Sequence, residues 1–192
     1  MEVSTRRLDE LLCELPAFTP KQAFDLAHSL WPDKYPELPR VMEEVDQLHA
    51  QGILNFGCFD VRMPIATEPV YDSVLGGDPE VVAKELEKRI RNEPRADSLQ
   101  PALVYWPTQR PLRIRTVNHE IAVTHLVTVI AQQNPGNWSF VGEHQRFDRS
   151  VPDGVVTVGE DTIVVDAIGD TYRSAKILKL LTAVGDRRIQ LW

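Results

Sequence analysis

Two short apolar runs near the C-terminus constrain the fold more than any other part of the sequence. Asp153 to Val158 is rich in valine and alternates weakly, and Ile163 to Ile168 is almost entirely apolar. Both patterns predict strands that are buried on at least one face. Gly159, Glu160 and Asp161, which separate the two runs, have the chemistry of a tight turn. The sequence therefore predicts an antiparallel hairpin at this place.

The hairpin brings two carboxylates together in either of its two possible registers. If the loop is Gly159-Glu160, Asp153 lies directly opposite Asp166; if it is Glu160-Asp161, Asp153 faces Ile168 and Asp166 is one diagonal away. Two carboxylates this close, one of them flanked by apolar residues, require a cation, a proton or another partner. Because Mg²⁺ is the usual cation for such a pair, Asp153 and Asp166 are candidate metal ligands and catalytic residues.

Each aspartate also has a purely structural interpretation: Asp153 suits a turn, and Asp166 can pair with an arginine. Two glutamates are candidate third metal ligands. Glu120 lies in the first turn of a helix predicted from His119 to Ala131, and Glu143 lies on the strand that precedes the hairpin. Glu120 is equally well explained by the favourable interaction of an acidic side chain with a helix N-terminus.

The first half of the chain predicts three helices followed by two strands. Leucines spaced at i, i+3, i+4 and i+7 predict a helix over residues 7–15. Thr19 as the cap, Pro20 at the first helical position and Gln22 as the reciprocal partner then start a second helix. The third helix and the two strands of a wing are expected at 38–52, 53–56 and 59–63. This order of elements is the outline of a winged helix.

The charge is distributed unevenly along the chain, whose net charge is -7. Residues 1–100 hold 11 Lys and Arg against 19 Asp and Glu, whereas residues 101–192 hold 10 against 9. The exposed positions of the predicted third helix carry three carboxylates and one basic residue, Arg40. Such a surface repels phosphates, so this helix is expected to pack against a protein partner or a second copy rather than read DNA bases.

Several basic residues remain candidates for contact with nucleic acid, although residues spread this widely are also typical of an ordinary surface. They are Lys21, Arg40, Arg146, Arg149, Arg173 and Lys179. Residues 79–91 form a further predicted helix in which basic and acidic residues interleave, which indicates a solvated face held by i,i+4 pairs.

The motifs around the hairpin resemble a known family. Pro152-Asp153 and Asp166-Ala167-Ile168 occupy the places of the Pro-Asp and acidic-x-Lys motifs of the PD-(D/E)XK nuclease core, with Ile168 in the lysine position. Together with His119-Glu120, Trp138 and Gly142-Glu143, they make roughly the last 75 residues similar to the replication-relaxation family. That family comprises plasmid and mobile-element proteins in which a winged helix is joined to a nuclease-like domain.

The resemblance implies an α/β (α+β) chain with a winged-helix-like module over residues 1–92 and a PD-(D/E)XK nuclease-like domain over 98–192. The loss of the lysine implies a non-catalytic, degenerate nuclease-like protein in DNA replication, transfer or maintenance. An active Mg²⁺-dependent endonuclease is the alternative, in which Lys176 on the following helix supplies the missing charge. A protein-interaction module that binds no nucleic acid is a third interpretation, favoured by the net charge.

Other classes of protein are disfavoured by composition. Cys13 and Cys58 have no Cys or His neighbours at ligand spacing, so neither a zinc site nor a disulfide is expected. No apolar run is long enough to span a bilayer, and residues 1–7 do not begin a signal peptide. The sequence predicts a cytoplasmic protein without membrane contacts.

Overall fold

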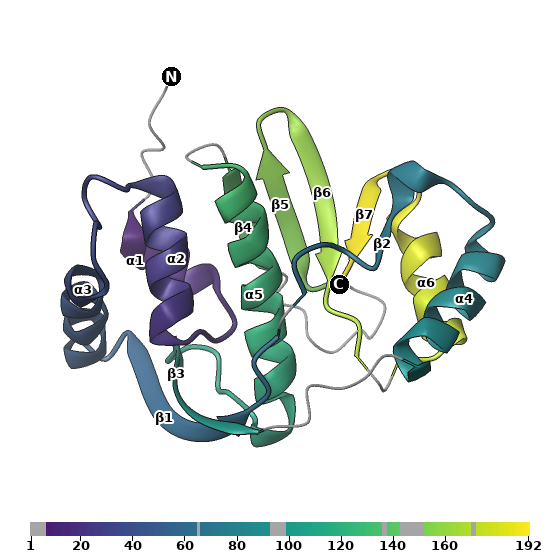
Figure 1. The fold of residues 1–192 in the computed structure, drawn as a ribbon. Coiled ribbons are helices and arrows are strands. Elements are labelled where there is room, and N and C mark those ends of the chain that lie inside the picture. Colours follow the sequence, from purple (N-terminus) through teal and green to yellow (C-terminus); the bar gives the residue numbers. More distant parts are fainter. Residues whose placement is uncertain (1–6, 65, 93–98, 136–137, 143–151, 170–171) are drawn as a thin grey trace. The chain divides into compact units, whose positions relative to one another are not determined.

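A computed structural model of the chain describes residues 7–64, 66–92, 99–135, 138–142, 152–169 and 172–192. Within these residues the fold is mixed α/β, with six α-helices and two sheets (Figure 1). The chain divides into two compact units, Met1–Ile65 with Ala96–Phe140 and Ala66–Arg95 with Val141–Trp192. The units are interleaved along the sequence, whereas the domains expected above, 1–92 and 98–192, are continuous segments.

Three helices open the first unit: α1 (Leu8–Glu14), α2 (Pro20–Leu30) and α3 (Leu38–Ala50). The predicted capping box of α2 is present, because Thr19 N donates to Gln22 Oε1 at 2.9 Å and Gln22 N donates to Thr19 Oγ1 at 3.3 Å. The predicted end of α3 is also confirmed. Gly52 has a φ of +72°, and the next residue donates its N–H back to the carbonyl of Leu48.

The predicted wing is wrong in its pairing. The two short strands expected within 53–63 form one continuous strand, β1 (Leu54–Val61), which pairs antiparallel with β3 (Gln100–Pro107). Phe18, between α1 and α2, bridges the other edge of β3 through two backbone hydrogen bonds with Tyr105, of 2.9 and 2.8 Å. The partner of β1 therefore comes from a segment about 40 residues further along the chain.

The predicted helix beginning near His119 is α5 (Val117–Gln133), which packs against α2 in the first unit. Two long-range hydrogen bonds fix this contact. Gln22 Nε2 donates to the carbonyl of Ile121 at 3.0 Å, and Thr124 Oγ1 donates to the carbonyl of Ala17 at 2.5 Å. One side of the β1–β3 ribbon packs onto the first turns of α5 through Val61 and Val104. The buried side chains of Gln22 and Thr124 are thus paired with backbone carbonyls, as burial requires.

The second sheet has the strand order β2-β7-β6-β5-β4, and the boundary between the two units falls within β4. The hairpin strands β5 and β6 are antiparallel, whereas β6 and β7 are parallel and are joined through α6. A helical connection is what two neighbouring parallel strands require. The elements span Tyr71–Asp72 (β2), Trp138–Gly142 (β4), Gly154–Val158 (β5), Asp161–Asp166 (β6), Ser174–Val184 (α6) and Arg188–Leu191 (β7).

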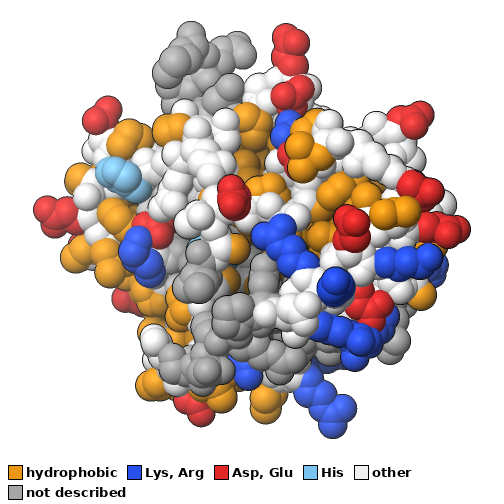
Figure 2. All heavy atoms as spheres, turned by 45° about the vertical axis from the view of Figure 1, so that its right-hand side comes forward, with side chains coloured by type: hydrophobic (Ala, Val, Ile, Leu, Met, Phe, Trp, Pro, Cys, Tyr) orange, Lys and Arg blue, Asp and Glu red, His pale blue; other side chains and the backbone are white. Residues whose placement is uncertain are grey.

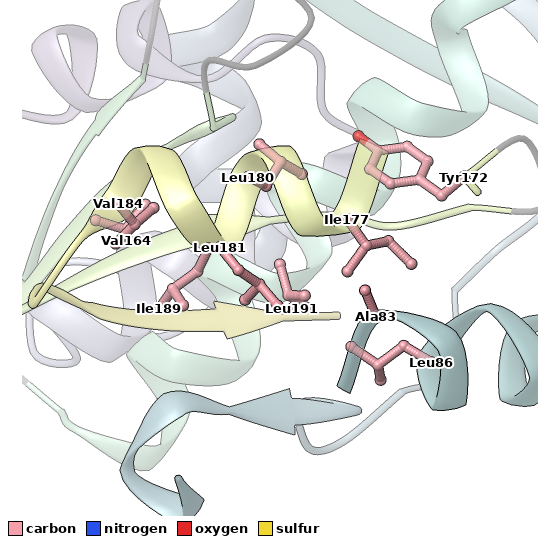
Figure 3. Close-up of a cluster of buried hydrophobic side chains, with 10 residues drawn as sticks. All are labelled: Ala83, Leu86, Val164, Tyr172, Ile177, Leu180, Leu181, Val184, Ile189 and Leu191. Atoms are coloured by element: carbon pink, nitrogen blue, oxygen red, sulfur yellow. The ribbon is translucent and has the colours of Figure 1, made fainter. Parts of the chain in front are cut away.

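The core of the second unit lies between its helices and one face of the sheet (Figure 3). The helix predicted over 79–91 is α4 (Pro79–Asn92), which buries Ala83 and Leu86 against α6. Figure 3 shows these two side chains directed toward Ile177, with Tyr172 beside it at one end of the cluster. The other buried members are Val164, Leu180, Leu181, Val184, Ile189 and Leu191.

Candidate functional site

The hairpin adopts the first of the two predicted registers. Gly154 pairs with Val165 and Val158 pairs with Asp161, which leaves Gly159 and Glu160 as a two-residue loop. Gly159 has a φ of +60°, the conformation that the first position of a type II′ hairpin loop requires. One step beyond the last pair of this register, Asp153 lies opposite Asp166. The two carboxylates are therefore aligned across neighbouring strands, as the sequence predicts.

Asp153 links the start of one hairpin strand to the end of the other. Its Oδ2 accepts a hydrogen bond of 2.8 Å from the backbone N–H of Ala167, which follows the last residue of β6. The side chain is half-buried. A half-buried carboxylate that accepts a hydrogen bond from a backbone N–H stabilises the fold without a metal ion.

Asp166 is the most deeply buried carboxylate described, with 1% of its surface exposed. Its side chain accepts a hydrogen bond from the hydroxyl of Tyr172, which is also buried. Burial raises the pKa of Tyr172, and the negative charges of Asp166 and Asp153 raise it further. Tyr172 is therefore a permanently neutral donor toward this carboxylate.

Lys176 reaches the same place from the first turn of α6. Its Nζ lies 3.2 Å from the centre of the Tyr172 ring, a cation–π contact. Tyr172 thus contacts the ammonium group through its ring and the Asp166 carboxylate through its hydroxyl. The structure brings together three predicted catalytic residues, Asp153, Asp166 and Lys176, around one tyrosine that the motif analysis did not single out.

Ile168 occupies the position of the nuclease lysine and is part of the core. Its N–H donates to the carbonyl of Trp192 at 2.7 Å, while Trp192 N donates to the carbonyl of Asp166 at 3.0 Å, so the β6–β7 ladder continues past the ends of both strands. Its side chain packs against the cluster between α4 and α6. An apolar residue at this position stabilises the second unit rather than providing a charge.

The predicted metal ligands are only partly within the described structure. Among the described residues there is no group of three or more His, Cys, Asp or Glu side chains arranged to hold a metal ion. Glu143, Arg146 and Arg149 lie outside the described residues. Glu120 lies in the first turn of α5 in the first unit and is buried, with 6% of its surface exposed. Of the four predicted metal ligands, the described structure therefore brings together two, Asp153 and Asp166.

No protein-family model matches the chain, and no curated protein or solved structure matches it significantly.

The basic residues predicted to contact nucleic acid are held by carboxylates where the structure describes such a contact. Lys21 Nζ lies 2.5 Å from Asp25, and Arg40 NH1 lies 2.8 Å from Glu43 on the exposed side of α3. Arg173 Nε lies 3.9 Å from Glu87, whose Oε2 also accepts the N–H of Ser174 at the start of α6. Lys179 is exposed on α6. On the side that carries α4 and α6, basic and acidic side chains are interspersed (Figure 2).

A second polar cluster lies at the edge strand of the second sheet. Asp72 on β2 accepts hydrogen bonds from Arg188 NH2 at 2.6 Å and from Gln190 Nε2 at 2.7 Å, both from β7. Burial opposes the charge of Asp72, but these hydrogen bonds outweigh it and hold the pKa of Asp72 below its usual range. Arg188 and Gln190 alternate along β7, so both side chains lie on one face of this strand.

None of the helices described is long and apolar enough to cross a bilayer.

Proposed function

We propose that this chain acts in DNA transactions of a plasmid or other mobile element, and that its second unit is a nuclease-like scaffold without catalytic activity. Two features of the element order support the proposal. The chain opens with three helices and a strand, α1, α2, α3 and β1, which is how a winged helix begins, although the partner of β1 is the distant strand β3 and not an adjacent wing strand. Further along, α5, β4, β5, β6 and α6 follow in the order that the resemblance implies for a nuclease-like core.

One observation supports the loss of catalysis most strongly: both aspartates of the hairpin have structural uses. Asp153 accepts the N–H of Ala167, and Asp166 accepts the hydroxyl of Tyr172. In addition, Ile168 occupies the lysine position and packs into the core. A metal-dependent hydrolase needs its carboxylates available to an ion and a cation beside the reacting phosphate. The hairpin motifs are explained here by stability alone.

The proposal is tested by binding and cleavage measured on the same preparation. We expect retention of duplex DNA that weakens as salt rises, and no nicking of supercoiled DNA in Mg²⁺ or Mn²⁺. In calorimetric titration with either ion, we expect the wild-type protein and Asp153→Asn to give the same result, because Asp153 does not bind a metal ion. Absence of salt-sensitive DNA binding would contradict the proposal and favour a protein-interaction module.

An active endonuclease is the second candidate, and the position of Lys176 favours it. The ammonium group lies against the tyrosine that bonds Asp166, so a lysine from α6 is near the carboxylate pair. The two aspartates suit a hard divalent ion as oxygen ligands. When bound, Mg²⁺ would polarise a phosphodiester, and Lys176 would neutralise charge on the phosphate.

This second candidate predicts a specific pair of variants. Lys176→Met should abolish Mg²⁺-dependent cleavage, whereas Lys179→Met, one turn further along α6 and exposed, should leave it unchanged. Cleavage that persists in Lys176→Met would exclude this residue as the displaced lysine. Cleavage absent from the wild-type protein would leave the scaffold proposal in place.

A further inference from the structure

The described part of the first unit contains eight basic residues, and five of them are paired with carboxylates. In each of the five pairs the nitrogen and oxygen atoms are 3.8 Å apart or closer, so each cation already has a negative partner. They are Arg7–Asp9, Lys21–Asp25, Lys34–Glu44, Arg40–Glu43 and Arg110–Glu14. The pairs include Lys34 and Arg40, which flank or belong to α3, the helix that reads bases in a winged helix.

The other three basic residues behave differently. Arg62, Arg113 and Arg115 are exposed, and within the described residues none of them forms an ion pair. The nearest carboxylate in sequence is Asp60, which is exposed on β1 and is not paired with Arg62. Unpaired guanidinium groups can bind an anion without first breaking an existing contact.

The fold gathers these three arginines at the N-terminus of α5. The backbone N–H of Arg62 donates to Asn118 Oδ1 at 2.8 Å, which fixes the end of β1 against the first turn of the helix. The short helix η2 (Ile114–Thr116) leads directly into α5, and Thr116 N donates to the carbonyl of Arg113 at 2.9 Å. We call Arg62, Arg113, Ile114 and Arg115 the arginine tip.

Ile114 gives the arginine tip an apolar centre. It lies between two exposed arginines and is 79% exposed, as much as any large apolar side chain described. Its neighbours on the other side of the segment, Leu112 and Met63, pack against the core of the first unit. The turn is therefore anchored from within, while its outer surface presents isoleucine between cations.

We propose that the arginine tip is the surface through which the first unit binds duplex DNA, with the arginines on phosphates and Ile114 inserted toward the minor groove. The inference rests on the proposed function and locates its DNA contact away from α3. Arginines that contact phosphates beside an inserted apolar side chain are a known mode of minor-groove binding. The N-terminus of α5 adds a favourable partial positive charge. For a chain of net charge -7, a local cluster of free cations is needed to overcome repulsion.

Binding of a fluorescein-labelled duplex, followed by anisotropy as salt is raised, tests the arginine tip. The triple variant Arg62→Ala, Arg113→Ala, Arg115→Ala removes three phosphate contacts, so the slope of log affinity against log salt should fall by about 2.7. Between about 50 and 200 mM salt, the wild-type protein should lose about 40-fold more affinity than the triple variant. The matched control, Lys21→Ala with Arg40→Ala, removes two paired cations of the same unit and should leave the slope unchanged.

Ile114→Ala separates the apolar contact from the charges. We expect weaker binding of the duplex with an unchanged salt slope, because no phosphate contact is lost. The assignment of the arginine tip would be overturned if the triple variant kept the wild-type salt slope, or if the control variant showed a reduced slope. Neither result would contradict DNA binding by the protein. A wild-type protein that binds no duplex would overturn the proposed function itself. If the triple variant lost binding to vesicles of anionic lipid but kept its binding to DNA, the tip would be assigned to a membrane surface, and the inference would also be overturned.

Discussion

The hydroxyl of Tyr172 donates a hydrogen bond to the carboxylate of Asp166, and both side chains are buried. A charged group this deeply buried is stable only while its hydrogen bonds are made. The tyrosine comes from the segment between β6 and α6, so the bond fixes that segment against the sheet. The stability of the second unit should therefore be sensitive to a single oxygen atom.

Replacing Tyr172 with Phe should lower the free energy of unfolding by about 1–3 kcal/mol, because a buried carboxylate loses a donor. The ring that contacts Lys176 is kept. Urea denaturation followed by circular dichroism gives the value. The matched control is Tyr71→Phe, which removes a half-buried hydroxyl that bonds to no described group and should change stability by less than about 0.5 kcal/mol. Equal effects of the two substitutions would contradict the role given to Tyr172.

Asp153 is expected to stabilise the hairpin through its acceptor oxygen. Asp153→Ala leaves the N–H of Ala167 without this partner and should cost about 1–2 kcal/mol. Asp153→Asn keeps an oxygen at the same place and should cost less. Glu160→Ala, on the exposed loop of the same hairpin, serves as the control. If Asp153→Ala unfolded at the same urea concentration as the wild-type protein, the structural use of this carboxylate would be refuted.

Asp72 predicts a dependence of stability on pH. Hydrogen bonds from Arg188 and Gln190 hold the pKa of Asp72 below its usual range in the folded protein. Their contribution is therefore complete above the unfolded pKa, about 3.9, and is lost as the pH falls through the lower folded value. Asp72→Asn should cost about 1–3 kcal/mol at pH 7. The difference in the free energy of unfolding between the two proteins should narrow once the pH falls below about 3.9, the unfolded value.

The pH series needs a carboxylate that makes no such contacts. Asp186 is exposed in the turn before β7, and within the described chain it has no ion pair or side-chain hydrogen bond. Asp186→Asn should therefore follow the wild-type protein at every pH. A difference between wild type and Asp72→Asn that stayed constant from pH 7 to pH 3 would show that the charge of Asp72 is not what stabilises the sheet edge.

Gly159 is required by the conformation of the hairpin loop. Its φ of +60° is costly for any residue with a Cβ, so Gly159→Ala should destabilise the protein by about 1–2 kcal/mol. Gly169→Ala is the control, since a Cβ there meets no atom within 4 Å and its φ lies outside the left-handed region. Thermal unfolding of both variants measures the difference, and equal midpoints would contradict the loop assignment.

Local patterns predicted the elements whose determinants lie within a few residues. The capping residues Thr19 and Gln22 predicted the start of α2, and Gly159 with its apolar flanks predicted the hairpin but left two registers open, of which the structure has the first. Both registers placed Asp153 and Asp166 on neighbouring strands, and the loop observed in the structure aligns them directly, because pairing in a hairpin is set by its loop.

Other features depend on contacts that no local pattern contains. The residues of β1 alternate as a hairpin strand would, but their partner β3 begins after a segment that belongs to the other unit. Tyr172 lies in no motif, and its importance arises only because it is buried between Asp166 and Lys176. Similarly, Arg62, Arg113 and Arg115 are distinguished by forming no ion pair within the described residues, which composition cannot reveal.

Strand β7 lies between β2 and β6, although it follows both of them in the sequence. During translation the two flanking strands therefore leave the ribosome before the strand that separates them. Until Arg188 to Leu191 emerge, β6 exposes a bare edge, and Tyr71 and Asp72 have nothing to pair with. Premature termination shortly before Arg188 would leave these edges open to chaperones, proteases and other nascent chains. The synthesis of β7 therefore decides whether the strands made before it are protected from such contacts.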